Sequence, residues 1–405
     1  MLLLFLLVAG PVLAAPPARA AGVRYASPTG TAAHDCLTPA TACSIDKAIN
    51  SALANDEVQL APGSYSTAVA LSNSGGLNVH GTAGQPRPLI TTSAVNGLVL
   101  LGDGVHLSDV AIEHTGAASG VLLYSANSLT ERVQVRSAGS SACTLGLSGL
   151  TRDTLCVATA PGGAAVDPSF GGSSAITAEM RNVTAVATGA GGVGLRSNVN
   201  GIGAGFMLDA RNVIAVGTTD VERNATGGAT VTITLQNSNF STVSSSGPGS
   251  LTSPGTPTNQ TAEPVFADTV RYHQAATSPT VDAGAVDPAL GPSDLDGEAR
   301  VRGKAPDIGV DEFPTDTTAP DTTIGKAPKK KTFKQKARFT FSATEPGSTF
   351  LCMIDRKPAT PCTSPYKKKV RKRGKHTFTV RAVDAVGNVD ATPATVTWKL
   401  RKRPS

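Results

Sequence analysis

The stretch Arg181-Asn-Val-Thr-Ala-Val186 decides the fold, because almost the same six residues return as Arg211-Asn-Val-Ile-Ala-Val216. Weaker copies of this polar pair and apolar strand occupy 107–112, 130–135, 152–157 and 237–242. With Val110, Val133, Leu155, Val183, Val213 and Phe240 taken as equivalent, the steps are 23, 22, 28, 30 and 27 residues. A strand-forming phrase repeated at this period is typical of a solenoid, whose units bury their apolar faces only by stacking.

A second phrase repeats in step with the first. Gly97-Leu-Val-Leu-Leu101 and Gly120-Val-Leu-Leu-Tyr124 lie 23 residues apart, like the phrases that follow them. Each coil therefore contains at least two strands, and alternation of apolar and polar residues gives each strand an inward and an outward face. We expect the coils to span 66–250, with a Ser, Gly, Pro and Thr-rich loop over 244–262.

The segments at the two ends of the coil region are predicted to complete the solenoid. Residues 22–65 are expected to cap it, with strands at 23–25 and 57–60 and a helix that begins after Ser44. The apolar helix residues that would share one face are Ile45, Ala48, Ile49, Ala52 and Leu53. Residues 263–314 form the closing segment, and 315–321 a linker.

The C-terminal part differs from the rest in charge and in pattern. Residues 322–400 contain four strand-like runs, over 337–342, 349–354, 376–382 and 394–400, with the spacing of a small β-sandwich. Residues 321–405 carry 21 Lys and Arg but 5 Asp and Glu, a net charge of +16, whereas residues 1–320 carry −10. Trp398, the only tryptophan, is expected in the sandwich core.

Export is predicted from the N-terminus and from the cysteines. Residues 1–20 read as a signal peptide, because a short apolar run precedes the cleavage-like Ala18-Arg-Ala20. The six cysteines fall into three local pairs, Cys36/Cys43, Cys143/Cys156 and Cys352/Cys362, which we expect to be disulfides in an oxidising compartment. Zinc-type spacing of Cys or His is absent from the sequence.

Five segments resemble parts of known families. Tyr25-Ala-Ser-Pro-Thr-Gly30 and Val58–Tyr65 resemble the start of bacterial right-handed parallel β-helix proteins of the pectate-lyase-like superfamily. Residues 278–284 and 306–313 resemble the closing motif of their "choice-of-anchor Q" type, and residues 320–388 are similar to bacterial Ig-like repeats. The resemblance implies an all-β fold, a right-handed parallel β-helix with a small C-terminal Ig-like sandwich. It leaves function open, because the family contains enzymes and many members without an assigned activity.

The residues before each aligned strand are interpreted as structural. They are Asp109, Arg132, Thr154, Asn182, Asn212 and Asn239. Asn tolerates a left-handed bend and can stack in a ladder of amides along the solenoid. The preceding positions place Asp153 beside Arg181 on neighbouring coils, an arrangement that we interpret as a solvated ion-pair ladder, with a lyase-like acid and arginine as the alternative.

Candidate catalytic and metal-binding residues are scattered. Four acids on different coils, Glu113, Glu131, Asp153 and Asp209, could pair as in a glycoside hydrolase. His106 and His114 flank Asp109 but lack a spaced third partner, so we expect them in turns or at the surface. Asp294-x-Asp296-Gly297 matches part of a calcium loop without its distal Glu, and no metal or other cofactor is predicted, with calcium as the alternative.

The basic C-terminal residues are the predicted binding site for a polyanion. These are Lys329, Lys330, Lys331, Lys334, Lys336, Arg338, Lys367, Lys368, Lys369, Arg371, Lys372 and Arg373, with a further basic tail over 401–405. A domain with a net charge of +16 attracts polyanions at low salt, although such residues also serve solubility alone. No motif for reading nucleic-acid sequence accompanies them.

Together these features predict an exported, non-catalytic extracellular or wall-associated protein that binds polysaccharide or an anionic wall polymer. It is expected to be a monomer without a transmembrane span. The alternative is a polysaccharide lyase or glycoside hydrolase acting on an acidic polysaccharide.

Overall fold

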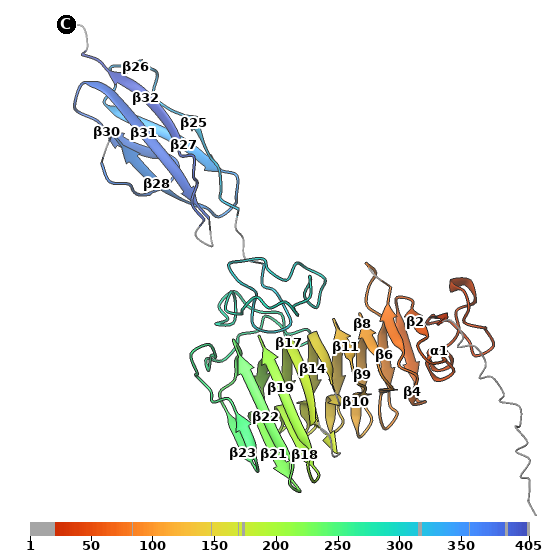
Figure 1. The fold of residues 1–405 in the computed structure, drawn as a ribbon. Coiled ribbons are helices and arrows are strands. Elements are labelled where there is room, and N and C mark those ends of the chain that lie inside the picture. The colour runs from red at the N-terminus through yellow and green to blue at the C-terminus, as the bar shows by residue number, and fades with distance from the viewer. Residues whose placement is uncertain are drawn as a thin grey trace, which may run out of the picture. The chain divides into compact units, whose positions relative to one another are not determined.

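The computed structural model describes residues 21–402 except 83, 147, 169, 172–174, 315–317, 356 and 385–387. The predicted signal peptide, residues 1–20, lies outside the described residues. Two compact units follow each other in the chain, the first ending at Phe313 and the second beginning at Pro314. The first is a parallel β-solenoid and the second a β-sandwich (Figure 1).

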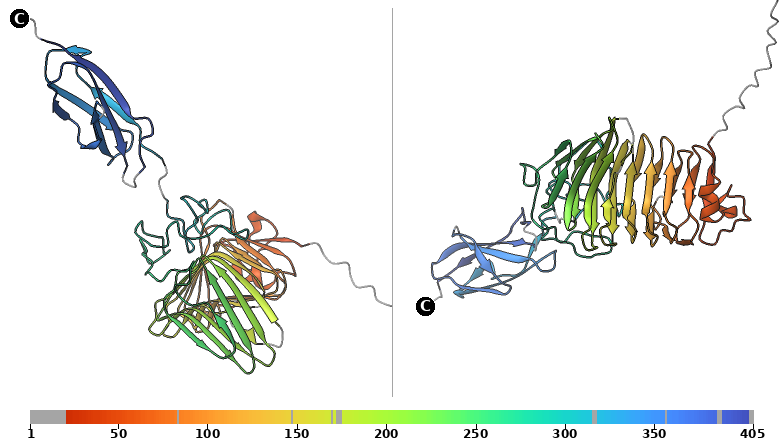
Figure 2. Two further views of the ribbon diagram at one scale, coloured as in Figure 1. Left: turned by 60° about the vertical axis from the view of Figure 1, so that its left-hand side comes forward. Right: turned by 90° about the horizontal axis from the view of Figure 1, so that it is seen from below.

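Three rows of parallel strands run along the solenoid, one more than the minimum of two expected from sequence (Figure 2). The first row is β1 (Val23–Ala26), β2 (Glu57–Leu60), β5 (Asn78–Gly81), β8 (His106–Ser108), β11 (Ser128–Glu131), the first parts of β14 (Gly149–Ala158) and β17 (Ala175–Ala187), β19 (Gly205–Arg211), β22 (Thr230–Gln236) and β24 (Gly249–Leu251). The second row is β3 (Ser64–Thr67), β6 (Leu89–Thr92), β9 (Ala111–His114), β12 (Gln134–Ser137), the second parts of β14 and β17, and β20 (Ile214–Val216).

The third row is β4 (Leu71–Asn73), β7 (Leu98–Leu101), β10 (Ser119–Tyr124), β13 (Ser141–Gly146), β15 (Ala164–Val166), β18 (Val193–Asn200), β21 (Thr219–Thr226) and β23 (Val243–Ser246), with β16 (Phe170–Gly171) beside β18. The predicted register of the second phrase is confirmed here, because Leu98 pairs with Val121. Inward residues of all three rows form one continuous apolar core along the stack.

The recurring phrase spans the bend from the first row to the second. Each bend is a single residue with positive φ, and these residues are Asp109, Arg132, Asp153, Asn182 and Asn212, with φ of 51–54°. Asn and Asp adopt this left-handed conformation more readily than most residues. The predicted amide ladder is confirmed where Asn212 Nδ2 donates to Asn182 Oδ1 at 3.2 Å.

The sequence alignment of the phrase is wrong in two coils. Thr154, not Leu155, pairs with Val183, so the bend falls on Asp153 instead of Thr154. Leu155 faces outward and is apolar because the closing segment covers it. In the last coil Asn239 pairs with Ile214, which shifts Phe240 out of the predicted register.

The N-terminal cap contains the expected strand β1 and helix α1 (Ile45–Asn50), preceded by the short 3₁₀ helix η1 (Pro39–Thr41). Ile45, Ala48 and Ile49 are buried, but the helix ends before Leu53, which is exposed. The Cys36–Cys43 disulfide crosslinks the cap and Cys143–Cys156 joins β13 to β14, both as predicted.

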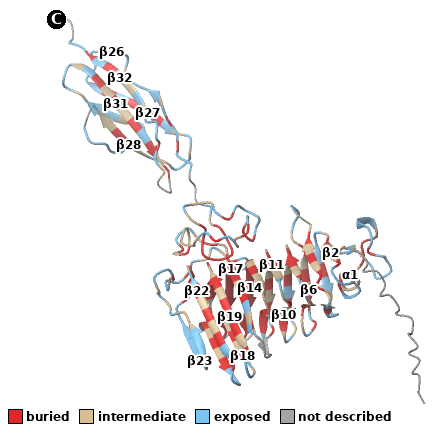
Figure 3. Ribbon diagram, viewed as in Figure 1, coloured by how far each residue is buried: buried red, intermediate tan, exposed pale blue. Residues whose placement is uncertain are grey.

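The loop predicted at 244–262 is partly wrong, because β23 and β24 form in it. These strands continue the third and first rows by pairing with β21 and β22. Backbone hydrogen bonds to an existing sheet edge do not require apolar side chains, and β23 is exposed along its length (Figure 3). Buried Arg223 helps to close this end by donating to the backbone oxygens of Gly247 and Pro248 at 2.8 and 2.7 Å.

The C-terminal unit is a two-sheet β-sandwich. One sheet is β25 (Thr322–Lys326), β27 (Lys336–Ala343) and β30 (Tyr366–Lys369), and the other is β26 (Lys331–Thr332), β32 (Ala394–Leu400), β31 (Gly374–Val383), β28 (Thr349–Ile354) and β29 (Thr360–Cys362). Phe339 stacks on Phe378 with 3.9 Å between ring centroids, and Trp398 lies in this core as predicted. The Cys352–Cys362 disulfide, also predicted, links β28 and β29.

Within the described part of the chain, no helix has the length and apolar character needed to cross a membrane.

Candidate functional site

Charged side chains from four successive coils gather on the outer flank of the solenoid. The register places Glu131, Arg152, Arg181 and Arg211 at equivalent positions of the first row. Successive strands of a sheet lie about 4.8 Å apart. Three arginines on neighbouring strands would repel one another at this distance unless carboxylates lie between them.

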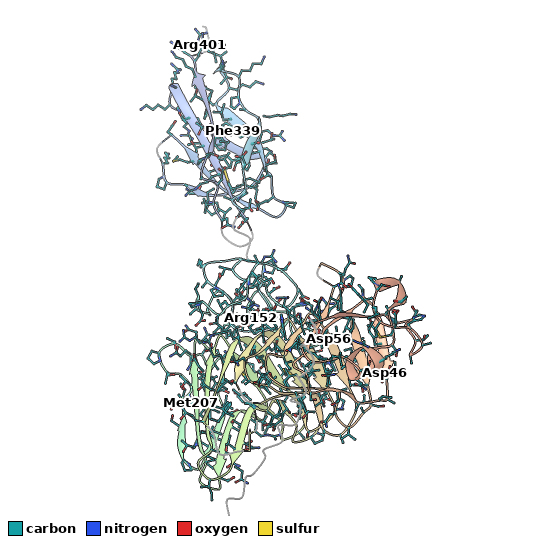
Figure 4. All side chains as sticks on the ribbon, turned by 45° about the vertical axis from the view of Figure 1, so that its right-hand side comes forward. Asp46, Asp56, Arg152, Met207, Phe339 and Arg401 are labelled. Carbon is teal, nitrogen blue, oxygen red and sulfur yellow. A yellow bond between two sulfur atoms is a disulfide. The ribbon has the colours of Figure 1, made fainter. Side chains whose placement is uncertain are left out.

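The closing segment covers this flank instead of leaving it open (Figure 1; Arg152 is labelled in Figure 4). Asp287 of that segment lies between two ladder arginines, with Oδ1 at 3.1 Å from Arg181 Nε and Oδ2 at 2.8 Å from Arg211 Nη1. Arg152 donates to the Ala289 backbone oxygen at 3.2 Å. The arginines are therefore occupied by partners within the chain.

The bend residues hold the same segment. Asn182 Nδ2 donates to the backbone oxygens of Asp307 and Gly309 at 3.1 and 3.2 Å. Asn212 both donates to the Ala285 oxygen and accepts from the Ala285 N–H. The amides that were interpreted as bend formers thus also dock the closing segment.

Arg300 lies at the centre of the contact between the closing segment and the flank. Asp153 pairs with Arg300 and does not lie beside Arg181, which corrects the prediction. Arg300 Nη2 lies 2.6 Å from Asp153 Oδ1, and Nη1 lies 3.2 Å from Glu312 Oε1. All three side chains are at least 97% buried. The register brings Asp153 next to Asn182, not next to Arg181, because the bend falls one residue earlier than predicted.

Burial changes the protonation of the two acids that share Arg300. It raises the pKa of Asp153 to about 6 despite the guanidinium. Burial, and then the charge of Asp307, raise the pKa of Glu312 to about 8. One arginine therefore faces two carboxyl groups that do not both ionise at neutral pH.

Two of the other predicted catalytic acids form ion pairs with arginines, and the third is exposed on another row. Glu131 lies 2.6 Å from Arg152 and 3.4 Å from His106. The nearby His106 ring and, against burial, the contact with Arg152 lower its pKa to about 2, far from that of a general acid. Asp209 pairs with Arg181 at 2.9 Å. Glu113 is exposed on the second row, in register with Arg136.

The two candidate histidines have different environments. His114 is buried inside the solenoid, where its ring nitrogens contact Ser137 Oγ and the Ala94 oxygen at 2.8 and 2.9 Å. This position corrects its prediction as a turn or surface residue. His106 is half-buried beside Glu131.

A groove in the C-terminal sandwich gathers part of the predicted polyanion site. It has a volume of about 590 Å³ and is lined by Phe333, Lys334, Gln335, Lys336, Lys369, Arg373, Leu400 and Arg401, which we call the basic groove. Lys336 and Lys369 lie directly opposite each other on β27 and β30. Like charges in this position repel, so the fold holds together two cations that form no ion pair with a described residue.

The remaining walls of the groove are fixed by backbone hydrogen bonds. The Gln335 oxygen accepts from the Val370 N–H at 2.8 Å, and the Thr332 oxygen accepts from the Arg401 N–H at 2.8 Å. The Arg401 guanidinium lies 5.9 Å from the centre of the Phe333 ring, a cation–π distance (Arg401 is labelled in Figure 4). The five cations of the groove form no ion pair with any described residue.

The other predicted polyanion residues are exposed outside the groove. Arg338 and Lys367 form a second opposed pair on β27 and β30. The rest are Lys329, Lys330, Lys331, Lys368, Arg371 and Lys372. Sequence reasoning missed Phe333, and the available signal was a large aromatic residue inside a run of lysines.

One set of side chains among the described residues has the composition of a metal site. A ring nitrogen of His273 and one carboxylate oxygen each of Asp296 and Asp311 lie within 4.8 Å of one another. Asp294, the other predicted calcium ligand, accepts the Glu298 and Glu312 backbone N–H groups through its two oxygens.

Comparison with known proteins adds little to this geometry. No protein-family model matches the chain, and no curated protein matches it in sequence. A solved structure described as the crystal structure of pectate lyase Pel9A is similar at 13% identity and a TM-score of 0.40, over 72% of this chain and 96% of that one. The choice-of-anchor type and the Ig-like assignment stay predictions.

Proposed function

We propose that this protein is an exported, non-catalytic β-helix protein that binds an anionic polymer, an acidic polysaccharide or a phosphate-containing wall polymer, through the basic groove. The observation that carries the proposal is a groove lined by five cations, two of them on directly opposed strand positions, with no ion-pair partner among the described residues. A polymer with regularly spaced anions would relieve this repulsion, and Phe333 offers an apolar surface for a sugar ring.

The solenoid supports the non-catalytic part of the proposal. Its flank, where acids and arginines from several coils gather, is occupied by the closing segment through Asp287 and Arg300. The three disulfides fit an oxidising compartment outside the cell. The solenoid then serves as a rigid carrier of the binding domain.

Binding of the full chain to sodium polygalacturonate and to inorganic polyphosphate tests the proposal. The K334Q/K336Q/K369Q/R373Q variant should bind at least about tenfold more weakly, because each exposed ion pair contributes up to about 1 kcal/mol. The control K326Q/K329Q/K357Q/K375Q removes the same charge from exposed positions outside the groove. Its affinity should fall much less.

Salt dependence and turnover provide further readouts. Wild-type binding should weaken as salt rises from 50 to 500 mM, because exposed charges are screened. Equal losses in the two quadruple variants would reject the groove as the site. Release of unsaturated products or reducing ends from the polygalacturonate would reject the non-catalytic role.

A further inference from the structure

We propose that His273, Asp296 and Asp311 bind a divalent transition-metal ion such as Zn²⁺ within the closing segment. The three residues come from three separate stretches of the closing segment, and their ligand atoms lie within 4.8 Å of one another. This site is far in sequence from the basic groove, and the inference does not depend on the proposed polymer binding. It adds a cation site to a segment that otherwise serves to cover the flank.

The orientation of His273 is that of a metal-binding imidazole. Its Nδ1 lies 2.7 Å from Asp268 Oδ2, while Nε2 faces Asp296 Oδ2 at 2.7 Å. Asp268 is itself fixed, because its Oδ1 accepts the backbone N–H groups of Val270 and Arg271 at 2.8 and 2.6 Å. A carboxylate on the far ring nitrogen sets the tautomer of histidines that bind metals and increases their basicity.

Asp311 supplies an observation independent of the histidine. It is only 7% exposed, yet its one hydrogen bond among the described residues runs from the Gln274 backbone N–H to Oδ2 at 2.7 Å. The other oxygen, Oδ1, has no donor among the described residues and is not fully buried, so an ion can reach it. Arg271 Nη1 lies 3.1 Å from Asp296 Oδ1, so Asp296 offers an ion its other oxygen, Oδ2, which lies beside His273 Nε2.

The donor set favours zinc over calcium. Calcium takes six to eight oxygen ligands, whereas zinc accepts imidazole and carboxylate and often keeps one position for water. Ligands about 2.0 Å from a tetrahedral ion lie about 3.3 Å apart. His273 and Asp296, both partly exposed, therefore need to separate by about half an ångström, and ligand atoms as far as 4.8 Å apart would move closer by up to about 1.5 Å.

Titration calorimetry of the tag-free full chain with ZnCl₂ at pH 7.5 tests the site. Thiols do not interfere, because the six cysteines form three disulfides. We expect one ion per chain, and about 100-fold or greater loss of affinity in H273N and D296N. D268N should lose about 10- to 100-fold, as expected for a residue that orients a ligand.

The control is H80N, because His80 lies 3.0 Å from Glu57 in a histidine–carboxylate pair that belongs to no three-ligand group among the residues that the structure describes. Its zinc affinity should equal that of the wild type. Affinity should also rise with pH, since the ion displaces the proton of His273. No binding by the wild type, or equal binding by H273N and D296N with native circular dichroism spectra, would overturn the proposal.

Discussion

The flank of the solenoid and the basic groove both concentrate arginine and lysine, but they differ in what accompanies the charge. On the flank, Arg181 and Arg300 are almost completely buried and contact carboxylates of distant segments. In the groove, Lys336 and Lys369 are exposed and face each other. Paired, buried charge fastens one part of the chain to another, whereas unpaired, exposed charge of one sign leaves its counter-ion to be supplied from outside.

The largest difference between the two regions is expected when a cation is removed. R300M leaves Asp153 and Glu312 buried without their guanidinium, so it should lower the free energy of unfolding of the solenoid by about 3–5 kcal/mol at pH 7. Urea unfolding followed by far-ultraviolet circular dichroism measures this change.

Two controls make the R300M result specific. Arg302 pairs with Glu298 four residues earlier on the surface of the same segment, so R302M should change stability by no more than about 0.5 kcal/mol. K336M in the groove should be equally mild. If R300M were as mild as these variants, the closing segment would not be fastened by buried charge.

The second prediction concerns pH and separates the buried acids from exposed ones. An acid whose pKa is higher in the folded state binds its proton more tightly there, so stability falls as pH rises from the unfolded to the folded pKa. For Glu312 this window runs from 4.5 to about 8. The solenoid should therefore lose a few kcal/mol of stability between pH 5 and pH 8.

E312Q tests the source of this slope. A Gln oxygen can still accept the Asp307 N–H and the Arg300 guanidinium, which Glu312 Oε1 accepts at 2.9 and 3.2 Å. The variant should unfold with a flatter pH profile and be more stable than the wild type at pH 8, while E298Q should keep the wild-type profile. An unchanged slope in E312Q would assign the pH dependence to other groups.

The difference between local and long-range contacts also explains which features of the fold could be predicted from the sequence. The repeat and the local disulfides were predictable because the interacting residues are close in the chain or recur at one period. The outward Leu155 broke the pattern because its partners, Tyr272, Leu295 and Val310, come from the closing segment. Asp153 and Arg300 lie 147 residues apart, and no spacing rule connects them.

Of the candidate site, only the basic region could be predicted from the sequence, because its charges are nearly all of one sign. Lysine runs marked the basic region, because unpaired cations remain visible in composition. They did not show which cations share a groove, since the pairing of β27 with β30 decides that Lys336 faces Lys369. Phe333 joins them only through the course of the chain between β26 and β27.

The smallest expected effect tests whether the groove carries repulsion that an external anion could relieve. K369E places a carboxylate directly opposite Lys336, and opposite charges across a strand pair contribute about 0.2–1 kcal/mol. The sandwich should become slightly more stable while polymer binding weakens. Fluorescence of Trp398, the only tryptophan and buried in the sandwich core, follows the unfolding of this domain within the full chain.

K357E provides the matched control for that measurement, because it makes the same change of charge at an exposed position outside the groove. It should leave binding nearly unchanged at 150 mM salt, where charges more than about 8 Å apart are screened. It should not raise stability, because Lys357 lies near the Asp355 carboxylate. A loss of stability in K369E would mean that the opposed lysines do not repel each other measurably. The groove would then lack the electrostatic feature that distinguishes it from the closed flank, and its cations would be no different from the other exposed lysines of the domain.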